Sequence, residues 1–183
     1  MAHEKSDVEK IRGLIKGIRI AMLTTVDEDG ALRSRPMATQ QTEFDGDLWF
    51  FTGASSPKVG EIDKDRQVNV SYAAPDDNTY VSLSGTARLV RDKAKAEELW
   101  NPFLKAWFPK GLEDPELALL RVEVEKAEYW DSPSGKMVQL AGFVKAIVTG
   151  HRYEAGKGEH DKVDLKENAT PEPAGAGAGA GRK

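Results

Sequence analysis

Along the first 130 residues, apolar positions recur with the two periods that distinguish helices from strands. Near the N-terminus, a capping-box pattern at residues 6–9 predicts the start of a helix, and Gly17 is expected to end it. Farther on, apolar and polar residues alternate, which predicts strands because successive side chains of a strand point to opposite faces. The apolar face of the helix consists of Val8, Ile11, Leu14 and Ile15. The predicted strands cover residues 18–26, 31–42, 48–52, 67–74, 79–90 and 117–130.

Short turns connect most of these strands, and further helices are predicted over residues 56–63, 92–100 and 102–108. Pro36 cannot donate a ladder hydrogen bond, so the second strand is expected at a sheet edge or at a bulge. Gly85 inside the fifth strand indicates a bulge or the close approach of another backbone. This order of elements predicts a mainly β fold, an antiparallel barrel or sandwich with flanking helices. The sequence lacks the glycine motifs of a Rossmann dinucleotide site and of a P-loop.

The chain changes character near residue 150. The periodicity of residues 137–149 fits a strand and a helix equally. Residues 151–183 are mainly polar, and residues 174–181 are an Ala/Gly repeat. Such a segment buries too little apolar surface to offset its chain entropy. We therefore predict one domain over residues 1–150 and a disordered polar tail over residues 151–183, most clearly at its Ala/Gly-rich end.

Composition narrows the classes of function. The formal net charge of −4 offers no basic surface for nucleic acid or for an anionic membrane. No apolar run approaches the ~20 residues that span a bilayer, and the polar N-terminus lacks the apolar core of a signal peptide. Without cysteine there is no disulfide and no thiolate metal site, so a cytoplasmic location is expected. His3, His151 and His160 lie near the ends of the chain, which argues against a metal site and against a Ser-His-Asp triad.

One stretch combines groups that suit an anion. The aromatic strand at residues 48–52 breaks at Gly53 and is followed by a helix with Ser56 as N-cap and Pro57 at its first position. A helix N-terminus presents unpaired N–H groups and a partial positive charge. With the Ser56 hydroxyl and Lys58 beside it, this N-terminus suits a phosphate. The alternative interpretation is a capped surface helix that follows an edge strand.

Several segments, by their order and spacing, resemble one known family. Gly30–Met37, Leu48–Thr52 and Ser55–Lys58 resemble the flavin-binding segments of the pyridoxamine 5′-phosphate oxidase-like split barrels. Four further segments resemble the general stress protein 26 branch of that superfamily: Leu99–Pro102, Ala106–Gly111, Glu128–Ser132 and Gly158–Leu165. The resemblance implies a six-stranded antiparallel split β-barrel with flanking helices. It also implies a homodimer with one FMN in each of two clefts between the subunits.

Carried over by position, the resemblance assigns residues of the second and third strands to the flavin. It implies that Arg35, Pro36 and Met37 lie along the isoalloxazine ring and the ribityl chain. It also implies that Phe51 and Thr52 lie beside the cofactor.

The resemblance assigns the flavin phosphate to Ser56 and Lys58, joined by an arginine of the second strand. Arg35 is preferred for this role, and Arg33 is the alternative. Tyr80 and Trp130 are implied to close over the flavin from the second subunit. A dianionic phosphate suits this combination of basic side chains with a helix N-terminus.

The function implied is that of an FMN-binding, general stress protein-like flavoprotein, an oxidoreductase of low specificity acting on a small molecule. No catalytic residue is assigned, because a flavin itself carries the redox chemistry. Pro57 stands where the true oxidases have a second basic residue, and residues 131–137 lack the His and Arg that hold a substrate phosphate. Pyridoxamine phosphate oxidation is therefore disfavoured. The alternatives are a non-catalytic flavin-binding protein, a cofactor-free dimeric stress protein and a deazaflavin-binding reductase.

Simpler interpretations exist for several of these residues. Arg33 and Arg35 also suit solvent-facing strand positions, and Trp130 also suits a buried anchor at a strand end. A third group has helical spacing that is typical of core or dimer packing. This group consists of Trp100, Phe103, Leu104 and Trp107.

Overall fold

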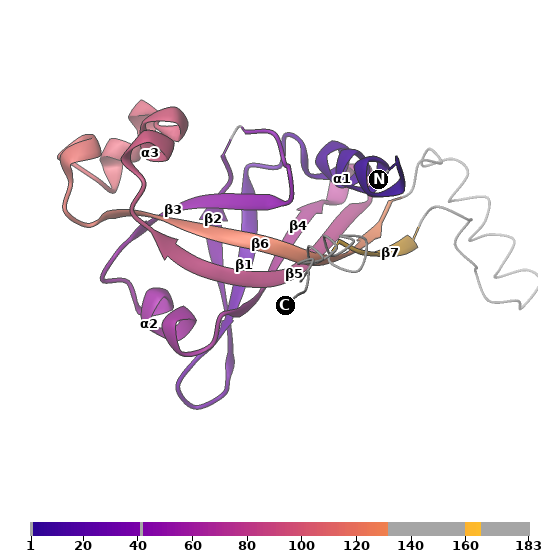
Figure 1. Ribbon diagram of the computed structural model, residues 1–183, viewed down its shortest axis with the longest axis horizontal. Helices are drawn as coiled ribbons and strands as arrows, with labels where there is room; N and C mark the ends of the chain where they lie inside the picture. Colours follow the sequence, from indigo (N-terminus) through magenta and orange to yellow (C-terminus); the bar gives the residue numbers. More distant parts are fainter. Residues whose placement is uncertain (1, 41, 132–159, 166–183) are drawn as a thin grey trace, which may run out of the picture.

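Seven antiparallel strands form a single curved sheet. The computed structural model describes residues 2–40, 42–131 and 160–165. The sheet has the order β2-β1-β4-β5-β6-β3, with β7 also paired to β6, and it curls into a half-barrel (Figure 1). The predicted split-barrel fold is confirmed. The strands are β1 Ile20–Val26, β2 Leu32–Ala38, β3 Asp47–Gly53, β4 Gln67–Ala74, β5 Thr79–Val90, β6 Leu117–Trp130 and β7 His160–Asp164.

The helices lie around the sheet. The α-helices are α1 Ala2–Ile15, α2 Pro57–Lys64 and α3 Lys93–Leu99, and the 3₁₀ helices are η1 Pro75–Asp77, η2 Pro102–Ala106 and η3 Gly111–Glu113. The capping-box prediction for the start of α1 is wrong, because the helix already includes the four residues before Ser6, among them the good helix formers Ala, Glu and Lys. Gly17 follows the end of α1 with φ of +85°, as predicted. At α3 the Asp92 side chain accepts a hydrogen bond from the Lys95 N–H at 2.9 Å, so that predicted cap is confirmed.

Gly85 marks a bulge between β5 and β6. The register shifts between Ser84 and Gly85. A Cβ atom at Gly85 would lie 2.0 Å from the Glu123 carbonyl oxygen, a distance that no side chain tolerates. The predicted bulge and close backbone approach are therefore both present. Pro36 lies in β2, which is the edge strand that its missing N–H requires.

Strand β6 pairs with three other strands. It pairs with β5 along one edge, while β3 and then β7 pair along the other. The prediction of a disordered tail is wrong for residues 160–164, because they form β7. Polar strands of this kind gain their stability from ladder hydrogen bonds, and here Val163 also packs against the core. Residues 137–149 lie outside the described residues, and the domain boundary at 150 stays a prediction.

The two faces of the sheet differ in character. Side chains on the concave face form the core, together with Ile11 of α1 and Ile62 of α2. On the convex face, Ile20 and Met22 alternate with the buried Ala21 and Leu23 and remain exposed. The largest fully buried side chains of this core are Phe50, Ile11, Leu23, Ile62, Leu83, Leu120, Val70, Val81 and Val122. Leu119 lies on the other face of β6, where it is buried with Ala96 and Leu99 of α3 in a second, smaller cluster.

Two aromatic residues in and directly after η2 do not enter the core. Phe103 and Trp107 are 85% and 72% exposed, whereas Leu104 between them is buried. The buried face of this segment carries Leu104 and Phe108, which are four residues apart, so Phe103 and Trp107 point to the opposite, exposed face. Core packing is therefore the wrong interpretation for these two residues, and dimer packing stays a prediction.

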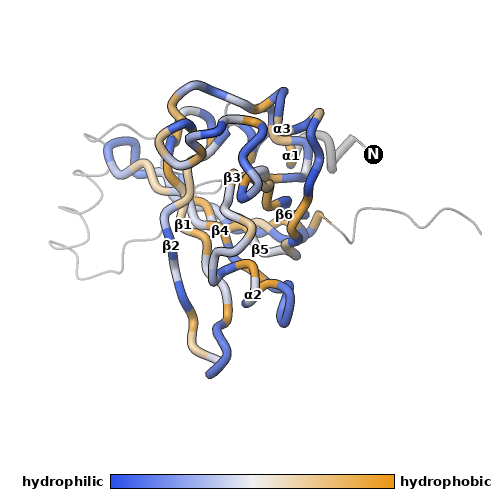
Figure 2. Tube along the Cα trace, turned by 90° about the vertical axis from the view of Figure 1, so that its left-hand side faces the viewer, coloured by the Kyte–Doolittle hydropathy of each residue, from blue (hydrophilic) through white to orange (hydrophobic). Residues whose placement is uncertain are grey.

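The hairpin between β1 and β2 extends toward α2. Both elements lie at the same end of the sheet (Figure 1), and the tip of the hairpin carries the hydrophilic residues 27–29 (Figure 2). An ion pair between Glu28 of the hairpin and Lys64 of α2 ties them together. This end of the fold therefore brings β1, β2 and α2 into contact.

Candidate functional site

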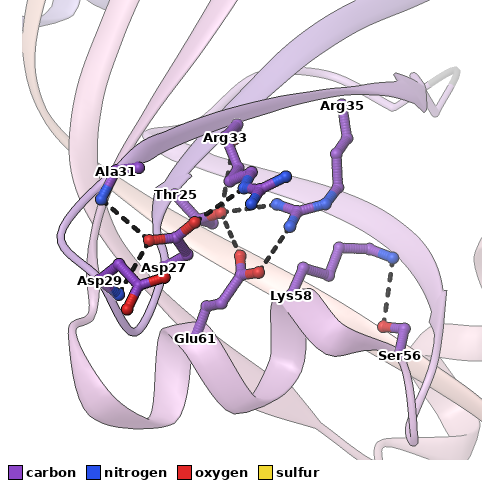
Figure 3. Close-up of polar contacts among 9 residues, drawn as sticks. All are labelled: Thr25, Asp27, Asp29, Ala31, Arg33, Arg35, Ser56, Lys58 and Glu61. Atoms are coloured by element: carbon purple, nitrogen blue, oxygen red, sulfur yellow. Dashed lines mark hydrogen bonds and ion pairs between the residues drawn. The ribbon is translucent and has the colours of Figure 1, made fainter.

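Three polar side chains meet where β1, β2 and α2 converge. Arg35 of β2 donates one hydrogen bond to the Thr25 hydroxyl at 2.7 Å and another to the Glu61 carboxylate at 2.6 Å. Thr25 of β1 in turn donates to the second carboxylate oxygen of Glu61 at 2.6 Å. The three side chains thus form a closed ring of hydrogen bonds (Figure 3).

The strand period explains why these groups converge. Thr25 shares the concave face of β1 with Ala21 and Leu23 and is 1% exposed. Arg35 lies two residues from the buried Met37 on β2, so it points to the same side. The side chains of Arg35 and Glu61 are 26% and 10% exposed. The ring is therefore largely shielded from water, which strengthens its charge-assisted hydrogen bonds.

Lys58 lies beside this ring without a carboxylate partner of its own among the described residues. Its ammonium group donates to the Ser56 hydroxyl at 3.2 Å, and the hydroxyls of Ser56 and Thr52 share a hydrogen bond at 3.2 Å. Figure 3 shows the ammonium on the opposite side of Arg35 from Thr25. Burial, and then the nearby charge of Arg35, lower the pKa of Lys58, while Glu61 acts in the opposite direction.

Glu61 remains an anion in this setting. Burial raises the pKa of its carboxyl, but the hydrogen bonds from Thr25 and Arg35 and the charge of Arg35 outweigh burial, so the pKa is lowered overall. One carboxylate therefore balances Arg35, while Lys58 adds a positive charge that no described carboxylate pairs with. The cluster of Thr25, Arg35, Lys58 and Glu61 carries an excess of one positive charge, and we call it the basic cluster.

The start of α2 adds further hydrogen-bonding groups. Ser56 is the N-cap residue and Pro57 takes the first helical position, as predicted. The Ser56 side chain makes no capping hydrogen bond, because its hydroxyl is turned to Lys58 and Thr52. Hydroxyl groups, a helix N-terminus and two cations in one place suit the oxygen atoms of a phosphate.

The predicted residues of β2 take three different positions. Arg35 enters the basic cluster, whereas Arg33 is exposed and donates to Asp27 at 2.7 Å. This hydrogen bond is the largest cause that lowers the pKa of Asp27. The Met37 side chain is buried in the core and Pro36 is exposed on the other face. Of the two arginines, Arg35 is thus the one that stands next to Lys58.

Phe51 and Thr52 lie on opposite faces of β3, since they are consecutive residues of a strand. Thr52 is buried and contacts Ser56. Phe51 packs instead against Trp100, with ring centroids 6.0 Å apart, and against Phe108 at 6.4 Å. Of these two side chains, only Thr52 belongs to the surroundings of the basic cluster.

Tyr80 and Trp130 lie far from the basic cluster within one chain. They are cross-strand partners on β5 and β6, and they are 42% and 41% exposed. Arg66 follows α2 closely, and its carbonyl accepts a hydrogen bond from the N–H of Ala87 in β5. Ala87 therefore marks the part of β5 that is near α2. Tyr80 is seven residues from Ala87, roughly 23 Å along a strand. It also faces away from the core side, because Thr79 and Val81 on either side of it are buried.

Two residues of the ring, Thr25 and Glu61, were not predicted from the sequence. Glu61 lies three residues after Lys58 on one helix, a spacing that places both on neighbouring positions of its surface. Thr25 lies two residues from Leu23 on an alternating strand, so its inward position follows from the period. These two local signals existed, but nothing in the sequence pairs either residue with Arg35.

The described residues show three further features of the molecule. A cavity of about 200 Å³ lies near the end of α1, lined by Arg12, Phe44, Trp49 and Tyr72 among others, and it shares no residue with the basic cluster. Within the described residues, no group of three or more His, Cys, Asp or Glu side chains is placed to hold a metal ion. No helix in the described part of the chain has the length and apolar character needed to cross a membrane.

Residues 6–154 match the family described as pyridoxamine 5′-phosphate oxidase like. Protein bli-3 of Neurospora crassa is 34% identical over 142 residues, which cover 72% of this chain and 68% of that protein. The general stress FMN/FAD binding protein from Xanthomonas citri is 33% identical and superposes with a TM-score of 0.61, over 72% of this chain and 92% of that chain. General Stress Protein 26 from Bacillus anthracis is 29% identical with a TM-score of 0.60, over 67% of this chain and 92% of that chain.

Proposed function

The chain belongs to the pyridoxamine 5′-phosphate oxidase-like family, and from this premise we propose that it binds FMN through the basic cluster. The single observation that carries the proposal is Lys58, a partly buried cation beside Arg35 with only a hydroxyl as its described partner. A buried charge costs free energy unless an opposite charge accompanies it. A phosphate group bound there supplies that charge. A similar protein from Xanthomonas citri is described as FMN/FAD binding.

The basic cluster and the groups next to it fit a flavin phosphate. Lys58 and Arg35 offer two cations, Ser56 and Thr52 offer hydroxyl groups, and the first turn of α2 offers backbone N–H groups. Glu61 removes one unit of positive charge, so the site favours an anion of low charge over a polyanion. These groups would hold the phosphate end of FMN, and the flavin would supply one- or two-electron redox chemistry when bound.

We further propose that a second copy of the chain completes the flavin site. Tyr80 and Trp130 are exposed on the convex face, far from the basic cluster of their own chain. Ile20 and Met22 are exposed on the same face, at the same end of the sheet. An exposed group of large apolar side chains of this kind is typical of an interaction surface. In a homodimer, aromatic side chains of one chain would cover the flat ring of a flavin held by the other chain.

The activity that fits this arrangement is that of a flavin-dependent oxidoreductase or flavin carrier in the cytoplasm. In either case, the chain's own residues bind the phosphate and shield the ring from water. Small-molecule substrates would reach the flavin at the cleft between the two subunits.

Flavin titration of the purified protein tests the proposal. We expect FMN to bind more tightly than riboflavin, which lacks the phosphate, and Lys58→Ala to reduce this preference clearly. Lys64→Ala is the matched control, because Lys64 lies on the same helix but is exposed and paired with Glu28. Equal affinity of the wild-type protein for FMN and riboflavin would contradict the phosphate site. A monomer in light scattering would contradict the shared cleft.

A further inference from the structure

We propose that Thr25 and Glu61 are positioning residues that hold the Arg35 guanidinium in its orientation for the flavin phosphate. The inference rests on the proposed function, since it concerns the same site. It adds two residues that the sequence did not identify and assigns to each a role through Arg35 rather than through direct contact with the ligand.

The geometry of the ring supports this role. Arg35 uses one terminal nitrogen for Thr25 at 2.7 Å and the other for Glu61 at 2.6 Å. A guanidinium group is planar, so two bonds at different ends fix both its position and its plane. Thr25 and Glu61 also bond to each other at 2.6 Å. Neither anchor can therefore move without breaking a second hydrogen bond.

The guanidinium retains donors for a ligand. It carries more N–H groups than these two bonds use, and no other described residue accepts from them. Lys58 lies on the side of Arg35 opposite Thr25 (Figure 3). An anion held between Lys58 and Arg35 meets the unused donors, while Thr25 and Glu61 stay behind the guanidinium.

Burial strengthens the effect of the anchors. Thr25 is 1% exposed and the Glu61 side chain is 10% exposed, so water does not readily replace either partner of Arg35. An arginine side chain has many rotamers, and fixing one of them in advance lowers the entropy cost of binding. The free protein thus already holds Arg35 in one rotamer, and binding need not order it.

Thr25→Val is the sharpest test, because it keeps the shape of the side chain and the charge of the cluster. We expect FMN to bind about tenfold more weakly, which corresponds to about 1.4 kcal/mol, and riboflavin to bind as in the wild type. Thr25→Ser keeps the hydroxyl and should restore most of the FMN affinity. Thermal unfolding of each flavin-free variant checks that it folds.

Glu61→Gln provides the second variant. It should also weaken FMN binding, by a smaller factor, because removing the carboxylate removes some repulsion of the phosphate as well. Asp47→Asn is the matched control, since Asp47 pairs with Arg121 at 2.7 Å and lies outside the basic cluster. In an Arg35→Ala background, Thr25→Val should cause no further loss, because its effect passes through Arg35.

Different results would contradict the phosphate site and the positioning role. If the wild-type protein does not prefer FMN to riboflavin, the phosphate site is wrong and the positioning role fails with it. If the wild-type protein has this preference but Thr25→Val binds FMN equally well, only the positioning role is wrong. Equal losses for FMN and riboflavin, or additive losses with Arg35→Ala, indicate a structural role and also overturn the inference.

Discussion

Two arginine–carboxylate pairs of this protein look alike but differ in their surroundings. Arg35 and Glu61 are 2.6 Å apart, with side chains 26% and 10% exposed. Arg121 and Asp47 are 2.7 Å apart, with side chains 27% and 18% exposed. Judged by distance and burial alone, the two pairs are equivalent.

Their neighbours distinguish them. Lys58 adds a cation next to Arg35. Around Arg121, acidic groups predominate: the hydrogen bond with Asp47 is the largest cause of its raised pKa, and the charges of Glu123 and Asp45 raise it further. Arg121 also lies over the Trp49 ring, 5.8 Å from its centroid. A half-buried ion pair is therefore not in itself a sign of function, whereas a half-buried pair with an additional uncompensated cation is.

Replacing the two arginines one at a time should have different consequences, and the effect on FMN affinity is the largest that we expect. Arg35→Ala should weaken FMN binding about 100-fold, since a charged hydrogen-bonding partner of the phosphate is lost. Arg121→Ala should leave FMN affinity unchanged and lower the free energy of unfolding instead. Isothermal titration and chemical denaturation of both variants measure the two effects. A similar loss of affinity in both variants would contradict the distinction.

Replacing Lys58 with a neutral residue should show how much the unpaired cation destabilises the flavin-free protein. Burial and Arg35 lower its pKa, so the folded state disfavours its charged form. We therefore expect Lys58→Met to raise the melting temperature of the flavin-free protein by a few degrees while it weakens FMN binding. Lys95 pairs with Glu98, so Lys95→Met should bring no such gain. A lower melting temperature for Lys58→Met would contradict an uncompensated charge.

The smallest effect that we expect is a pH dependence of the unfolding free energy that comes from Glu61. The pKa of Glu61 is lowered below its ordinary value of 4.5 in the folded protein. Its contribution to stability is therefore present above pH 4.5 and is lost as the pH falls through the folded-state pKa. The difference in unfolding free energy between wild type and Glu61→Gln should be constant near neutral pH and shrink below about pH 4.5. A difference that stays constant down to pH 3 would show that Glu61 does not titrate in this way.

Much of the fold follows from local patterns. The bounds of β4, β5 and β6 agree with the alternation of apolar and polar residues, and the Gly85 bulge follows from a glycine inside a strand. Strand β7 could not be predicted in this way, because its polar residues acquire their strand conformation from pairing with β6. Phe103 and Trp107 do share a face, as their spacing suggests, but Leu104 and Phe108 occupy the buried side, and the spacing alone does not say which of the two faces is buried.

The candidate site was predictable in part. Ser56 and Lys58 follow from the helix-start signal, and Arg35 follows from the resemblance to the family. Glu61 and Thr25 are 36 residues apart in sequence and meet only because α2 packs against β1. A single sequence contains no signal for such a contact, and it contains none for the other subunit that Tyr80 and Trp130 would face.

The ratio of the dissociation constants for riboflavin and FMN is the most direct test of the basic cluster as a phosphate site. It should be measured by fluorescence titration, side by side for the wild-type protein and for Lys58→Ala. We expect a ratio of about 100 for the wild type, because a phosphate with two cationic partners contributes about 2.7 kcal/mol, and a ratio of about ten for Lys58→Ala, in which Arg35 remains. Equal ratios in the two proteins would contradict the account.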